Sequence, residues 1–399
     1  MPKVSRRHFV QVASGTLATL GLHGTQLLQH RKVLAQPTSR RLGLVIGINA
    51  YVDAPLYGCV NDAILQRQLL IHRFGFNPRD VVMLLDQQAT RQGILDAIED
   101  HLIDQAKPGD IVVVHFSGHG SLVHDLDPIC VNPRTGEGMA GTLVPVDGTL
   151  PRIGEAREGV VPDIMGHTLF LLMSAIQTDH LTVVLDSCYA GAATRDDVRV
   201  RAREGGEGGD RITISHQEKA YQDRWLAHFG WSREEFVEQY QQGVARGVVL
   251  AATQNHQLAI DEQLNGFVAG AFSYRLTQHL WQQDGTPDHV LAEIQQQIPE
   301  NYRQQPKLEV AVGSDYGQRP LYFVENPNAI GHALVIEQEG DRVRLLLVGI
   351  DPGTVRAGTI FVNPDSQRRV TVGTRDGLIA IGQTTGSIAI GAVLTLGED

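Results

Sequence analysis

Residues 111–120 read IVVVHFSGHG and residues 181–191 read LTVVLDSCYAG, and in each stretch an apolar run ends in small polar residues. Such short apolar runs are typical of strands that are buried on both faces of a parallel sheet. Reactive groups in open α/β sheets gather at the carboxyl ends of the strands, and here those ends carry His119 and Cys188. Because neighbouring strands lie about 4.8 Å apart, the two stretches predict an imidazole beside a thiol.

The rest of the chain alternates apolar runs with segments of helical period, which predicts an α/β fold. Further strands are expected at residues 42–48, 81–85, 248–252 and 321–324. Helices are expected at residues 61–74, 94–102, 163–177 and 271–281. In this order the strands and helices form repeated strand–helix units, so we expect a mostly parallel sheet of six strands.

Composition excludes several classes of protein. Of the 399 residues, 42% are hydrophobic, which is ample for a packed core and excludes a wholly disordered chain. With 34 basic and 45 acidic residues the net charge is −11, which argues against a nucleic-acid partner. Three cysteines are too few for a disulfide scaffold, and they form no paired motif for structural zinc.

His119 and Cys188 are the candidate catalytic residues. A thiolate is the reactive form of cysteine, and a nearby imidazole can accept the thiol proton and later return one to a leaving amine. Backbone N–H groups at Gly120, at Cys188 and near Gly191 are candidates for an oxyanion hole. The alternative is that Cys188 is a small buried apolar residue and His119 a structural one. We expect no metal site, because His115 and His119 do not share the helical spacing of a metalloprotease pair.

The two motifs together resemble the caspase-like cysteine peptidases, and among them the metacaspases. Cyanobacterial members, called orthocaspases, look the most similar. Further matching segments lie at residues 45–49, 57–63, 142–147, 249–252, 270–272 and 305–306. The resemblance implies a caspase-like α/β/α sandwich over residues 40–328, with a large part to about residue 191 and a small part at 247–328.

The resemblance also implies a specificity. Metacaspases cleave after Arg or Lys, and the family's pocket positions fall here on Cys59, Asp62, Ser117 and Asp186. A carboxylate can make a charge-assisted, bidentate bond to a guanidinium group, so two of them would favour a basic residue at P1, the position before the cut. Asp62 has an alternative role as a helix cap. The alternative for Asp186 is to orient the loop that carries Cys188.

Residues 192–246 are rich in Arg, Asp and Gly, which predicts a flexible surface linker. Metacaspases commonly cut themselves in this region, and an exposed chain suits a protease cleft. The candidates for self-cleavage are Arg195, Arg199, Arg201, Arg203 and Arg211. The alternative is a solvated charged loop, because acidic residues are mixed among the arginines.

We expect no cofactor. Many metacaspases need calcium, which takes six to eight oxygen ligands. Here residues 139–141 read Met-Ala-Gly, and Asp163 stands alone where the family usually has two acidic residues. We therefore expect activity without calcium. The expected partners are proteins or peptides with a basic P1 residue, and we expect a monomer with no membrane span.

The two ends of the chain differ from its middle. Residues 1–35 hold five basic and no acidic residues, and Ser-Arg-Arg-His-Phe-Val at 5–10 resembles a twin-arginine export signal. This predicts export to a periplasm or thylakoid lumen; the alternative is a basic amphipathic helix on a cytoplasmic protein. Residues 331–399 alternate short apolar runs with turn signals, which predicts a small all-β domain, a sandwich or a barrel.

Two rival functions remain open. One is an α/β-hydrolase with a cysteine nucleophile, although its histidine would follow the nucleophile in sequence, whereas His119 precedes Cys188. The other is a catalytically silent caspase-fold scaffold that binds partners.

Overall fold

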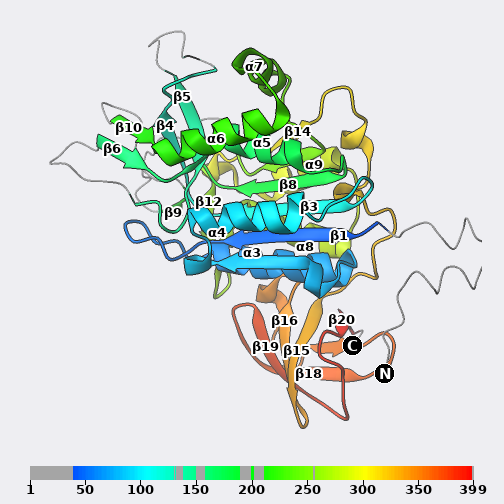
Figure 1. Cartoon of the computed structure of the whole chain (residues 1–399). Helices are drawn as coiled ribbons and strands as arrows, with labels where there is room; N and C mark the ends of the chain where they lie inside the picture. The colour runs from blue at the N-terminus through cyan, green and yellow to red at the C-terminus, as the bar shows by residue number, and fades with distance from the viewer. Residues whose placement is uncertain are drawn as a thin grey trace, which may run out of the picture. The chain divides into compact units, whose positions relative to one another are not determined.

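The structure, a computed structural model, describes residues 39–129, 131, 138–149, 158–188, 199–201, 211–254 and 257–397. Its central element is a six-stranded sheet with the order β14-β11-β8-β3-β1-β2 (Figure 1). The strands are β1 (Arg41–Gly47), β2 (Val81–Leu85), β3 (Ile111–Ser117), β8 (Leu181–Asp186), β11 (Val248–Ala251) and β14 (Lys307–Val310). All neighbours pair parallel except β14, which is antiparallel to β11. The predicted six-stranded, mostly parallel sheet is confirmed.

One expected strand is wrong. Residues 321–324 begin with a 3-10 turn, η7 (Leu321–Phe323), in which Tyr322 and Phe323 have φ of 60° and 54°. An extended chain cannot adopt these left-handed values. Tyr322 is fully buried, its ring centroid lies 4.9 Å from that of Phe74, and its hydroxyl accepts a bond from Gln66 (2.8 Å). The apolar residues at 321–324 thus indicate burial and not a strand. The sixth strand of the sheet is β14.

Helices cover both faces of the sheet. On one face lie α3 (Cys59–Gln68), α8 (Ala271–Gln282) and α9 (Pro287–Gln297), whose apolar residues share a core with Val45, Val113 and Val184. On the other lie α4 (Arg91–Asp96), α5 (Gly166–Ala175), α6 (His216–Phe229) and α7 (Arg233–Gln241), around Leu44, Val112 and Val183. Successive residues of each strand therefore pack into the cores on opposite faces of the sheet, as a three-layer α/β/α sandwich requires. Within the described ranges, no helix is long and apolar enough to span a bilayer.

The linker prediction is wrong for residues 211–246. This segment contains β10 (Arg211–Ile214) followed by α6 and α7. Ser215 and Ser232 cap the two helices by accepting the N–H groups of Glu218 and Glu235, and the buried Trp225 belongs to the core. Helix capping and burial of an apolar face therefore outweigh the charged composition. Residues 192–198 and 202–210 lie outside the described ranges.

Two small sheets lie beside the central one. The first has the order β6-β10-β4-β5-β7, and the second, β13-β12-β9, contains the short strand β9 (Arg199–Val200). Their other members are β4 (Gly120–His124), β5 (Met139–Leu143), β6 (Glu158–Val161), β7 (Ile164–Met165), β12 (Ile260–Gln263) and β13 (Val268–Gly270). The second sheet positions the site described below.

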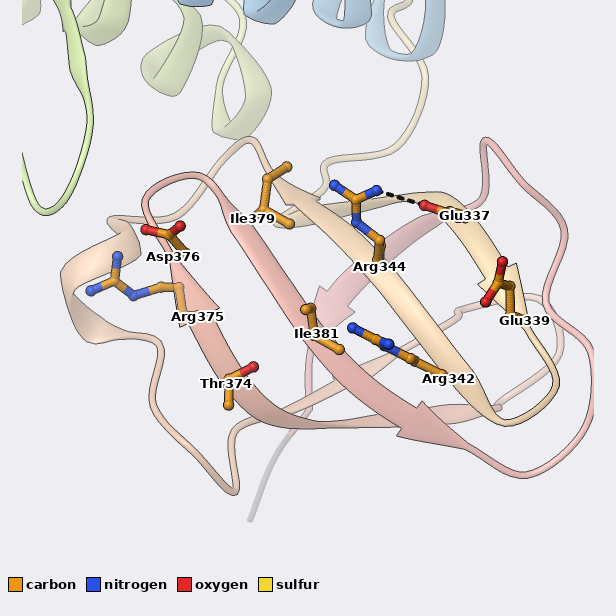
Figure 2. A pocket seen from close by; sticks show the side chains of 9 residues that line it. All are labelled: Glu337, Glu339, Arg342, Arg344, Thr374, Arg375, Asp376, Ile379 and Ile381. Carbon is orange, nitrogen blue, oxygen red and sulfur yellow. Dashed lines mark hydrogen bonds and ion pairs between the residues drawn. The ribbon is translucent and has the colours of Figure 1, made fainter.

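The C-terminal segment forms a closed antiparallel barrel in the order β15-β16-β19-β18-β17-β20, so the predicted all-β domain is confirmed. Its strands are β15 (Ala333–Glu339), β16 (Arg342–Leu347), β17 (Ile360–Val362), β18 (Arg369–Asp376), β19 (Ile379–Thr384) and β20 (Val393–Leu396). A hollow of about 520 Å³ lies on the outer face of β15, β16, β18 and β19. Figure 2 shows Ile379 and Ile381 there among charged side chains.

Candidate active site

The loops after β3 and β8 meet at one edge of the central sheet. Ser117 and Asp186 are register partners at the strand ends, and the Gly118 N–H donates to the Asp186 carbonyl (3.3 Å). His119 follows β3 and Cys188 follows β8, as expected from the sequence. The two loops approach so closely that a Cβ on Gly120 would lie 1.7 Å from the Cys188 carbonyl oxygen. Only glycine fits at this position.

His119 is held in one orientation. Its Nε2 lies 2.7 Å from the Ala54 carbonyl oxygen, which can only accept a hydrogen bond, so Nε2 carries the proton. In the neutral ring, Nδ1 is then the basic nitrogen. The Tyr51 hydroxyl accepts the His119 N–H (3.0 Å) and donates to the Val144 carbonyl (2.9 Å), while the two rings lie 4.5 Å apart. Tyr51 and Ala54 carried no motif by which the sequence could identify them.

Cys188 is fully buried. Burial raises the pKa of its thiol to about 12, although backbone hydrogen bonds at Ala259 and Arg201 oppose the shift. The Ala259 N–H donates to Sγ at 2.8 Å. In this state the thiol is protonated at neutral pH, so its reaction requires a base to remove the proton.

Three carboxylates surround the guanidinium group of Arg201. Its nitrogens lie 2.6 Å from Asp62, 3.0 Å from Asp261 and 3.2 Å from Asp186, and all four side chains are fully buried. Burial alone would lower the pKa of Arg201, but the carboxylates raise it above its ordinary value. Burial raises the pKa of Asp62 to about 6 against the opposing effect of Arg201. Asp62 therefore does not serve as a helix cap: it accepts the Gly270 N–H and the guanidinium group.

The other two predicted pocket residues lie at the same place. The Ser117 hydroxyl accepts from Arg201 Nη1 (3.2 Å) and donates to Asp62 (3.1 Å). Cys59 is buried at the start of α3; burial raises the pKa of its thiol well above the ordinary value, and the nearby Arg201 opposes that shift. Asp261 was not among the predicted residues.

The backbone of Arg201 is also bound. The Arg201 carbonyl oxygen accepts the N–H groups of Gly120 (3.0 Å) and Cys188 (3.1 Å). The Arg201 N–H donates to the Ala259 carbonyl (2.9 Å), and β9 pairs antiparallel with β12. Two N–H groups that converge on one carbonyl oxygen next to a cysteine have the geometry of an oxyanion hole.

The remaining candidates lie elsewhere. Arg211 begins β10, which pairs with β6, and Arg199 lies in β9 two residues before Arg201. His115 contacts the Ser117 hydroxyl (3.1 Å), and burial lowers its pKa to about 3. Across the described ranges, no group of His, Cys, Asp and Glu side chains is suited to hold a metal ion. Three predicted residues lie outside the described ranges: Gly191, Arg195 and Arg203.

Comparison with known proteins agrees with the caspase-like fold. The family model described as "Caspase domain" matches residues 40–315. Metacaspase-1 of Schizosaccharomyces pombe is 28% identical over 67% of this chain and 67% of its own length. Metacaspase-1 of Eremothecium gossypii is 27% identical over 69% of this chain and 64% of its own length. Metacaspase-1 of Cryptococcus neoformans is 33% identical over 43% of this chain and 36% of its own length. The chain thus spans about two thirds, or less, of these relatives' lengths. It belongs to the caspase-domain family, as a metacaspase-like cysteine peptidase.

Proposed function

We propose that this protein is an endopeptidase that cleaves after Arg or Lys through His119 and Cys188, and that it cuts its own chain after Arg201. One observation carries the proposal: Arg201 is bound as a P1 residue would be. Its side chain lies among buried carboxylates and its carbonyl oxygen accepts the Gly120 and Cys188 N–H groups. Of the five candidate arginines, Arg201 is therefore the one that we select.

The proposed reaction follows from these contacts. His119 Nδ1 takes the thiol proton, and Cys188 Sγ attacks the Arg201 carbonyl carbon, while the Gly120 and Cys188 N–H groups hold the charge that develops on oxygen. The bond to the Ala202 nitrogen then breaks, and His119 gives its proton to that amine. Water, deprotonated by His119, hydrolyses the thioester and restores the thiol.

Self-processing also implies an inactive precursor. While Arg201 occupies the pocket, it excludes the P1 residue of any other substrate. We therefore propose that the uncut chain is a zymogen, and that the new C-terminus at Arg201 must leave the pocket before another protein is cut.

Intact mass spectrometry tests the self-cleavage. Wild type should give two fragments divided between Arg201 and Ala202, whereas Cys188→Ala and Arg201→Ala should lack that cut. Arg344→Ala, which changes an arginine of the barrel, is the matched control and should be cut like wild type. An intact wild-type chain, or a chain cut only after another arginine, contradicts the proposal.

A panel of fluorogenic peptides that differ only at P1 tests the specificity, with Cys188→Ala as the blank. Cleavage of Arg and Lys peptides, with none after neutral or acidic residues, is the expected result. Binding of protein partners without any turnover would favour the scaffold function instead.

We also propose that the activity needs no calcium. The Asp163 carboxylate is fully buried and accepts the Thr142 hydroxyl (2.7 Å), while Met139, Ala140 and Gly141 offer no carboxylate. Turnover should therefore persist in excess chelator. Loss of turnover in chelator, with recovery on added calcium, would contradict this.

A further inference from the structure

A third carboxylate in the pocket comes from the part of the chain that follows residues 192–210. Asp261 lies on β12, its side chain is fully buried, and its Oδ1 is 3.0 Å from Arg201 Nη2. Asp62 and Asp186 precede residues 192–210 in the chain, whereas Asp261 follows them. The pocket is therefore complete only when the small part of the peptidase domain packs against the large part.

The acceptors are divided between the two terminal nitrogens of the guanidinium group. Nη1 lies 3.2 Å from Asp186 Oδ2 and 3.2 Å from Ser117 Oγ. Nη2 lies 2.6 Å from Asp62 Oδ2 and 3.0 Å from Asp261 Oδ1. A guanidinium group presents its donors in a fixed plane, whereas a lysine ammonium group is a single point of charge. One ammonium nitrogen cannot take both positions at once.

Asp261 is also held in place by contacts other than the one with Arg201. Its Oδ2 accepts the Tyr57 N–H (2.9 Å) and its Oδ1 accepts the Gly58 N–H (3.1 Å). A Cβ at residue 58 would lie 2.4 Å from Oδ1, so glycine is needed for this approach. Hydrogen bonds from two backbone N–H groups fix the direction of this carboxylate.

The same strand also binds the backbone beside the cut. The Ala259 carbonyl accepts the Arg201 N–H, and Ile260 and Asp261 are the register partners of Val200 and Arg199. Because the backbone is fixed in this register, a P1 side chain enters the pocket at a set depth. The guanidinium group of a P1 arginine then contacts Asp261. A P1 lysine, which has a single terminal nitrogen, would lose part of these contacts and bind less tightly.

We propose that Asp261 is a specificity-determining residue that favours Arg over Lys at P1. This proposal rests on the proposed function and deepens it, since that function alone allows either basic residue.

The test measures kcat/KM of the full-length chain on two peptides that are identical except for Arg or Lys at P1. In wild type we expect the Arg peptide to be preferred, and in Asp261→Asn we expect the Arg-to-Lys ratio to fall about tenfold or more, the value of one charged hydrogen bond. Glu262→Gln is the matched control, because this neighbouring carboxylate pairs with Arg275 and not with Arg201. Its ratio should equal that of wild type.

The ratio is insensitive to partial unfolding, because inactive molecules lower both rates equally. If Asp261→Asn loses all turnover, Asp261→Ser is judged by the same ratio, since its hydroxyl can still accept a backbone N–H. Equal losses on both peptides in the variant, or an unchanged ratio, would overturn the role of Asp261. A wild-type chain that cleaves neither peptide would instead overturn the proposed function.

Discussion

Two groups of charged side chains in this protein have the same chemistry and opposite surroundings. In the pocket, three carboxylates face one guanidinium group, and every one of these side chains is fully buried. The barrel hollow of Figure 2 is lined by three carboxylates and three guanidinium groups, from Glu337, Glu339, Asp376, Arg342, Arg344 and Arg375. There the Arg344–Glu337 pair is 45% and 42% exposed.

The difference shows what burial adds to charge. Water solvates the exposed groups of the hollow, so each ion pair there contributes little and no charge is in excess. In the pocket the carboxylates outnumber their single partner, and a buried charge without a partner is costly. Burial accordingly raises the pKa of Asp62 to about 6. This excess of buried negative charge makes the pocket a receptor for a cation.

The largest expected effect is on Asp62. Asp62→Ala should lower kcat/KM for an Arg peptide by about 30-fold or more, since truncating one partner of a buried ion pair costs about 2–5 kcal/mol. Glu337→Ala, at the exposed pair, should leave this value unchanged. The fold is monitored by circular dichroism, and wild-type kinetics in Asp62→Ala would remove the contrast between the two groups.

A smaller effect is expected on the reactivity of Cys188. In the uncut chain, burial raises the pKa of this thiol to about 12, so little thiolate is present at neutral pH. Arg201→Ala removes the side chain that anchors residue 201 against Cys188. Loss of the guanidinium group alone would raise the thiol pKa further, because that group lowers it, but exposure of the thiol should outweigh this effect, and alkylation of Cys188 by iodoacetamide should become about tenfold faster or more. Both chains carry His119→Ala to prevent self-cleavage, and the modified peptide is quantified by mass spectrometry.

Arg344→Ala in the same background is the control for that experiment, because it removes an arginine from the exposed group. It should leave the alkylation rate unchanged. Equal rates in the Arg201 and Arg344 variants would mean that Arg201 does not protect the thiol.

The pocket should also respond to pH over a range in which an exposed carboxylate does not. With Arg201 bound, the pKa of Asp62 is about 6, and loss of the guanidinium group would raise it further because that group lowers it. Protonated Asp62 cannot form the ion pair, so binding of a P1 arginine weakens as pH falls from above 6 to about 6, and levels off below that. KM for an Arg peptide should rise severalfold between pH 7.5 and 5.5, and this rise should be reduced in Asp62→Asn. Parallel profiles in the two proteins would contradict the assignment.

The sequence was sufficient to predict that His119 and Cys188 follow two neighbouring strands at one edge of the central sheet. Two apolar runs identify neighbouring buried strands, and polar residues at their carboxyl ends must meet at one edge of the sheet. It could not single out Arg201 among five arginines, because composition does not reveal which residue reaches a pocket. Asp261 was missed for a related reason: its role depends on the pairing of β12 with β9, which joins distant parts of the chain.

Residues 211–246 show the opposite case: the sequence there contained a signal for helices, but the composition of the whole segment led to the prediction of a flexible linker. Ser215 and Ser232 each precede a glutamate by three residues, a pattern typical of helix starts. The Gly-rich and Arg-rich residues before them favoured a flexible segment, yet α6 and α7 bury Trp225 and Phe236 in the core. Local capping signals are thus more reliable there than average composition.

The smallest expected effect is at the exposed pair of the barrel. Glu337→Gln removes the ion pair with Arg344 (2.6 Å) but leaves both side chains in contact with water, so the free energy of unfolding should change by less than about 1 kcal/mol. Urea denaturation of the Cys188→Ala chain, with and without this change, measures it, and added salt should reduce the difference. A loss of several kcal/mol would show that the hollow is as sensitive to charge as the pocket, and would refute the distinction drawn from burial.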